Sequence, residues 1–94
     1  MAFAASDRPR LSRRAELRWD RLEGKHFLLY PERGLALSAT AYEIVSLCDG
    51  TRTVERIVEN LAAAHPEAVR SEIEAGVLSF LEELVRRGLL EWGA

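Results

Sequence analysis

Residues 26–47 read HFLLYPERGLALSATAYEIVSL, and within this stretch the pattern changes from that of a strand to that of a helix. Residues 26–30 are aromatic or bulky and apolar, which predicts a buried strand. A turn follows, in which Pro31 presets φ and Gly34 can supply the positive φ that closes the loop. Residues 35–37 then form a short strand, which the short turn makes an antiparallel neighbour of the first.

The helical part of this stretch begins after Ser38, whose hydroxyl can accept a hydrogen bond from the first helical turn. Apolar side chains then recur at the spacing i, i+3, i+4, i+7, which places them on one face of a helix. These residues are Ala41, Ile44, Val45 and Cys48. Gly50 follows the last turn and can adopt the left-handed conformation that ends a helix.

Two more helices are predicted downstream. Thr51 or Thr53 caps the second helix. Ser71 and Glu74 have the capping-box spacing expected at the start of the third. Gly88 ends the third helix, and the apolar residues after it are expected to pack back onto the core.

A further strand is predicted upstream, because residues 16–21 alternate between apolar and polar side chains. The chain therefore contains three strands followed by three helices. Segregation of strands and helices indicates an α+β fold, with a three-stranded antiparallel meander followed by three helices. We expect residues 1–10 to form a flexible N-terminal tail and residues 11–94 to form a single domain.

Composition narrows the function classes. The net charge is −2, and residues 34–94 hold five basic against ten acidic side chains, which disfavours a nucleic-acid partner. No apolar run approaches the ~20 residues that span a bilayer, so no membrane association is expected. The N-terminus lacks a basic and then apolar signal pattern, and we therefore expect the protein to be cytoplasmic.

The titratable residues form no recognisable catalytic or metal-binding motif. Cys48 is alone and falls on an apolar helix face, while His26 and His65 are not accompanied by a nucleophile motif. We therefore expect no enzymatic activity, no cofactor and no metal.

A binding surface remains, at the outer edge of the strand in residues 34–38, which carries no charge. Either another part of the chain covers this edge, or an extended peptide adds to it as a further strand. Composition leaves both possibilities open.

The ordered set of motifs resembles the PqqD family of pyrroloquinoline quinone (PQQ) biosynthesis. The resemblance is carried by Pro9-Arg10-Leu11, Leu17-Arg18-Trp19-Asp20, Leu37-Ser38-Ala39-Thr40-Ala41, Leu47-Cys48-Asp49-Gly50, Arg52-Thr53-Val54 and Arg87-Gly88-Leu89-Leu90. It implies a winged-helix-like peptide-recognition domain. It also implies a non-catalytic peptide chaperone, which binds the ribosomally made precursor peptide PqqA and presents it to the radical-SAM enzyme PqqE.

The resemblance also implies a peptide-binding groove between the third strand and the third helix. Leu35, Ala36 and Leu37 are expected to pair with the peptide backbone. The apolar side of the groove is expected to consist of Ile73, Val77 and Leu81. Arg70, near the start of the third helix, is expected to meet an acidic side chain of the peptide.

Two alternatives belong to other functional classes. The first is a winged-helix DNA-binding domain, which requires a basic recognition helix. The second is a structural homodimer, in which edge strands pair or exchange between two copies.

Overall fold

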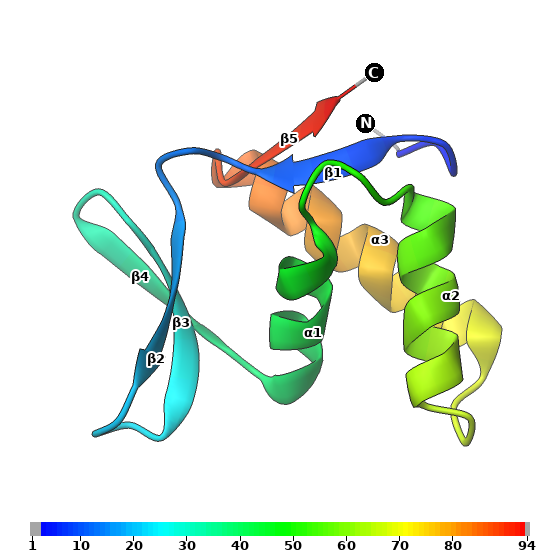
Figure 1. Cartoon of the computed structure of the whole chain (residues 1–94), viewed down its shortest axis with the longest axis horizontal. Helices are drawn as coiled ribbons and strands as arrows, with labels where there is room; N and C mark the ends of the chain where they lie inside the picture. Colours follow the sequence, from blue (N-terminus) through cyan, green and yellow to red (C-terminus); the bar gives the residue numbers. More distant parts are fainter. Residues whose placement is uncertain (1–2, 94) are drawn as a thin grey trace.

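The computed structural model describes residues 3–93 and contains two small sheets and three helices (Figure 1). In chain order the elements are β1 (Arg8–Leu11), β2 (Glu16–Asp20), β3 (Lys25–Tyr30), β4 (Arg33–Leu37), α1 (Ala39–Leu47), α2 (Val54–Ala64), α3 (Arg70–Arg86) and β5 (Leu90–Gly93). None of the helices in this part of the chain is long and apolar enough to cross a membrane.

The predicted meander of β2, β3 and β4 is confirmed, and so is its position ahead of the three helices. Both strand pairs are antiparallel. The turn between β3 and β4 differs from the prediction, because Tyr30 already pairs with Arg33. Glu32, with a φ of 64°, takes the positive φ, while Gly34 lies inside β4. With Pro31 at the first central position of a two-residue turn, the positive φ falls on the second.

Residues 8–10 of the predicted flexible tail, residues 1–10, lie in a strand, while residues 1 and 2 lie outside the described residues. Arg8–Leu11 forms β1, which pairs antiparallel with β5 at the other end of the chain. Pro9 is buried, and its carbonyl accepts a hydrogen bond from the Gly50 N–H at 3.0 Å. The tail-like composition was misleading because the partner of β1 lies about 80 residues away, and no local pattern reports such pairing.

The helix starts follow the predicted caps in two cases out of three. Ser38 Oγ accepts the Ala41 N–H at 3.1 Å, and Thr53 Oγ1 accepts the Arg56 N–H at 3.1 Å. The predicted capping box of α3 is wrong, because the helix starts at Arg70 and its N-cap, Val69, makes no side-chain bond. Ser71 therefore lies inside the helix.

The core lies between the three helices and the inner faces of the two sheets. Its most buried large side chains are Leu28, Ile57, Leu81, Leu84 and Leu89. Cys48 belongs to this core, as predicted, and its Sγ donates to the Ile44 carbonyl at 3.2 Å. Burial, and secondarily Asp49, raise the pKa of the Cys48 thiol to about 12.

Candidate functional site

The outer edge of β4 is open along its length. β4 is the last strand of the sheet, and within residues 3–93 no further backbone hydrogen bond reaches it beyond its ladder with β3. Hydrogen-bonded and non-hydrogen-bonded pairs alternate in an antiparallel ladder. Since Tyr30 and Arg33 close the two-residue turn as a hydrogen-bonded pair, the N–H and C=O groups of Gly34 and Ala36 point away from β3.

The side chains of the predicted edge residues also alternate, between the two faces of the sheet. Leu37 is buried and Leu35 is half-buried, so both face the core. Ala36 is exposed on the opposite face, as is Gly34. Of the three residues predicted to pair with a peptide backbone, only Ala36 presents its backbone groups outward. Gly34, which the prediction did not include, is the second such residue.

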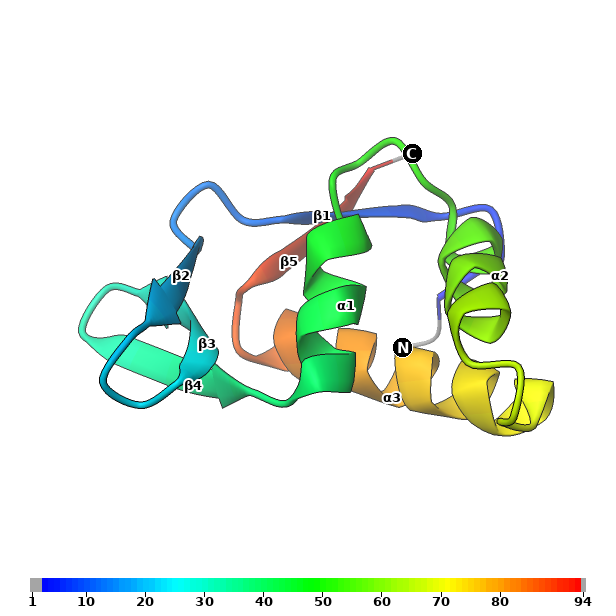
Figure 2. The same ribbon diagram turned by 60° about the horizontal axis from the view of Figure 1, so that its bottom comes forward.

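A small apolar hollow lies where β4 ends, between the first turn of α1 and the middle of α3. It has a volume of about 270 Å³. Its walls consist of Ser38, Thr40, Ala41, Ile44, Leu61, Glu72, Ile73, Gly76, Val77 and Phe80. Figure 2 shows α3 crossing behind α1, and the end of β4 leading into the start of α1. We refer to this feature as the α1–α3 hollow.

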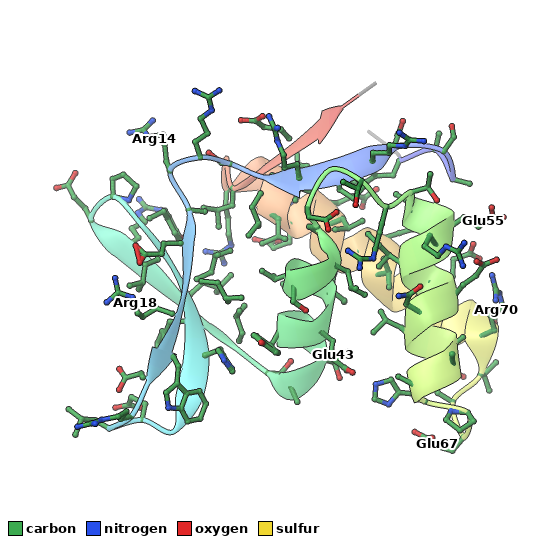
Figure 3. All side chains as sticks on the ribbon, in the orientation of Figure 1. Arg14, Arg18, Glu43, Glu55, Glu67 and Arg70 are labelled. Carbon is green, nitrogen blue, oxygen red and sulfur yellow. The ribbon has the colours of Figure 1, made fainter. Side chains whose placement is uncertain are left out.

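The structure divides the predicted residues of α3 into three groups. Ile73 is half-buried and lines the α1–α3 hollow, and Val77 lies at its base with 1% exposure. Leu81 is fully buried and does not line the hollow. Arg70 is exposed at the end of α3 that is remote from the β2–β3–β4 sheet (Figure 3). The structure therefore brings Ile73 and Val77 together near the end of β4, but not Leu81 or Arg70.

Residues that the sequence analysis missed complete the hollow. Phe80 is half-buried and Gly76 is exposed, and both line it from α3. The i, i+3, i+4, i+7 spacing of Ile73, Gly76, Val77 and Phe80 places them on one helix face. This spacing was visible in the sequence, but periodicity alone does not distinguish a core residue from one at the rim.

A second hollow of about 510 Å³ lies on the other side of Ser38, against the β2–β3 hairpin. The His26 ring stacks on Tyr42 with centroids 3.8 Å apart, and Trp19 meets the His26 ring edge-on at 4.8 Å. At the far wall His65 Nε2 lies 2.8 Å from Glu43 Oε1. The hydrogen bond and the charge of Glu43 raise the pKa of His65 above its ordinary value.

These features define a class of protein: a small α+β domain that offers a free strand edge beside a helix. Comparison with known families gives the particular group. Residues 25–90 match the family described as coenzyme PQQ synthesis protein D (PqqD). The chain belongs to the PqqD family.

Individual relatives agree with this assignment. A protein named PqqA binding protein from Rhodopseudomonas palustris (strain HaA2) is 40% identical over 90 residues, covering 96% of this chain and 87% of the relative. A bifunctional coenzyme PQQ synthesis protein C/D from Methylorubrum extorquens is also 40% identical over 90 residues, which make up 24% of that longer protein.

A solved structure shares the fold. It is the solution NMR structure of the PqqD truncation of Methylobacterium extorquens PqqCD, described as a functional, stand-alone recognition element for ribosomally synthesized and post-translationally modified peptides (RiPPs). The TM-score is 0.80 at 40% sequence identity, and the match covers 96% of this chain and 95% of that one.

Proposed function

We propose that this chain is a non-catalytic, cytoplasmic peptide chaperone of PQQ biosynthesis that binds a PqqA-like precursor peptide as a fourth strand on the β4 edge. The open edge of β4, which leads into α1 at the α1–α3 hollow, is the observation that carries the proposal. Gly34 and Ala36 offer free donors and acceptors there, and their small side chains leave room for another backbone. Strand addition gains affinity from main-chain hydrogen bonds and selectivity from side-chain pockets.

The α1–α3 hollow provides such a pocket. An extended segment of about five residues covers the length of β4, at ~3.4 Å per residue. If it continues past Leu37, it reaches Ser38 and Thr40, which form one wall of the hollow. Ile73 and Phe80 form the opposite wall. An apolar peptide side chain can be buried here, which favours one register of the added strand over the others.

The peptide's chemical modification is assigned to a partner enzyme. We propose that the bound peptide is presented to a PqqE-like radical-SAM enzyme, whose cofactors carry the chemistry.

DNA binding is a weaker alternative, because α3 holds four glutamates against two arginines and would repel phosphate.

Isothermal titration with the PqqA peptide of Rhodopseudomonas palustris (strain HaA2) tests the proposal. Ala36→Pro removes an outward N–H from the edge without touching the bonds to β3, and should abolish binding. Ala36→Ser keeps the N–H and the small side chain, and serves as the matched control. Circular dichroism should show that both variants keep the helices. Unchanged affinity in a folded Ala36→Pro variant would refute strand addition at β4.

The same edge can also pair with β4 of a second copy, which is the homodimer alternative. Sedimentation velocity with and without the peptide separates the two. Peptide binding at β4 predicts that any dimer dissociates as the peptide is added. A dimer that persists while peptide binds would place the peptide elsewhere.

A further inference from the structure

A third hollow lies at the β3–β4 turn, beside the end of α3, and two arginines line it. It has a volume of about 220 Å³ and is lined by Arg14, Tyr30, Pro31, Arg87, Gly88 and Leu89. We call it the turn hollow. Arg14 comes from the loop between β1 and β2, whereas Arg87 directly follows α3. Figure 3 shows Arg14 at the same end of the molecule as the β2–β3–β4 sheet and far from Arg70.

Arg33 adds a third positive charge at this end. It is the first residue of β4, and its side chain leaves the sheet on the same face as that of its partner Tyr30. Tyr30 in turn lines the turn hollow. The start of the β4 edge is therefore next to the arginine-rich hollow.

These charges are only partly neutralised by the chain itself. Glu83 accepts from Arg86 at 2.5 Å and from Arg87 at 2.9 Å, so one carboxylate serves two arginines. Among residues 3–93, no acidic partner is found for Arg14 or Arg33. Glu32 is exposed in the adjoining turn. This end of the edge therefore keeps a positive excess.

The α1–α3 hollow at the other end of the edge carries an acidic side chain instead. There the α1–α3 hollow contains Glu72 and no basic side chain. A peptide lying along β4 would therefore meet positive charge near Arg33 and negative charge beyond Leu37. Such a gradient favours one direction of the bound peptide and disfavours its reverse.

We propose that the turn hollow, with Arg33, is a carboxylate subsite that fixes the direction of the peptide bound on the β4 edge; the inference rests on the proposed function. A peptide residue placed beside Arg33 projects toward the same face as Arg33 and so toward the hollow. Arginine is suited to this task because its fork of donors matches the two oxygens of a carboxylate. The carboxylate is an acidic side chain or the peptide's own C-terminus.

Titration of paired protein and peptide variants tests the subsite. Arg14→Gln and Arg33→Gln each remove a charge from it, whereas Arg13→Gln removes one from the exposed neighbouring position that does not line the hollow. The R. palustris peptide is used unaltered, with each Asp and Glu changed in turn to its amide, and with an amidated C-terminus. Each titration is repeated at low and high salt.

Arg14→Gln and Arg33→Gln should weaken binding of the unaltered peptide about fivefold more than Arg13→Gln does. The peptide that lacks the bound carboxylate should bind all three protein variants with the same affinity. The position amidated in that peptide identifies the carboxylate. The subsite is excluded if the three variants weaken binding equally, or if the excess loss persists with every amidated peptide.

The outcomes separate this inference from the function on which it rests. If peptide binding is lost in Ala36→Pro but is unaffected by Arg14→Gln and Arg33→Gln, only the carboxylate subsite is refuted. If the unaltered chain does not bind the peptide, both proposals are refuted.

Discussion

His65 ends α2 and is tied to α1 through Glu43 at 2.8 Å, while Glu67 lies farther from the ring, at 3.7 Å. Because Glu43 favours the protonated ring, the pKa of His65 in the folded chain is raised above its ordinary value. A raised folded-state pKa contributes stability that is complete below the unfolded pKa of about 6.5 and is lost as the pH rises through the folded pKa.

We therefore predict that Glu43→Gln lowers the pKa of His65 toward 6.5, as followed by NMR of the imidazole ring. Glu67→Gln should lower it less, because Glu67 is the more distant of the two carboxylates. The stabilising effect of Glu43 should be largest below about pH 6.5. A His65 pKa that does not respond to Glu43→Gln would show that the pair is not formed in solution.

At single residues, local interactions were predictable from the sequence and positions set by the tertiary fold were not. The caps Ser38 and Thr53 were predictable, since capping depends on residues three positions apart. The role of Arg70 was not, because its position at the remote end of α3 depends on how the helix lies against the sheet. Arg14 and Arg87 come together across the fold, and nothing in their local sequence links them.

Among the elements, α3 serves both the core and the proposed groove. Leu81 is fully buried, whereas Ile73 is half-buried at the α1–α3 hollow. The apolar periodicity predicted the helix, yet it placed Ile73, Val77 and Leu81 together in the groove. Periodicity identifies an apolar face, but the division of that face between core and groove depends on its neighbours.

We predict that Leu81→Ala lowers the free energy of unfolding by about 3 kcal/mol, because it leaves a cavity in the core. Ile73→Ala should cost only about 1 kcal/mol of stability, but should weaken peptide binding about fivefold. Urea unfolding and calorimetric titration measure the two quantities. The assignment of Ile73 to the groove fails if its alanine variant binds peptide with unchanged affinity.

For the molecule as a whole, the ends of the chain are joined by the β1–β5 sheet, which lies across the tops of the helices (Figure 1). Residues before β1 also bind α2: the Asp7 carbonyl accepts the Val54 N–H at 2.8 Å, and the Ala5 carbonyl accepts the Glu55 N–H at 3.1 Å. The three-stranded meander and the three helices were predicted from local patterns. The second sheet was not, since it joins segments from opposite ends of the chain.

Hydrogen exchange distinguishes this arrangement from the flexible tail that the sequence suggested. Val54 and Glu55 begin α2, where amides have no partner within the helix. We predict that they are nevertheless protected, because the N-terminal segment binds them. The first-turn amides of Ala39 and Thr40 in α1, which find no partner within residues 3–93, provide the control and should exchange rapidly. Equal, rapid exchange at both helix starts would mean that the segment is not docked.

Amide hydrogen exchange with and without the R. palustris PqqA peptide decides whether a precursor peptide becomes the fourth strand of the sheet. Without peptide, Gly34 and Ala36 should exchange rapidly, while Leu35 and Leu37, bonded to β3, should be protected. With peptide bound, Gly34 and Ala36 should become protected as well. Peptide binding that leaves the exchange of Gly34 and Ala36 unchanged would contradict strand addition at β4.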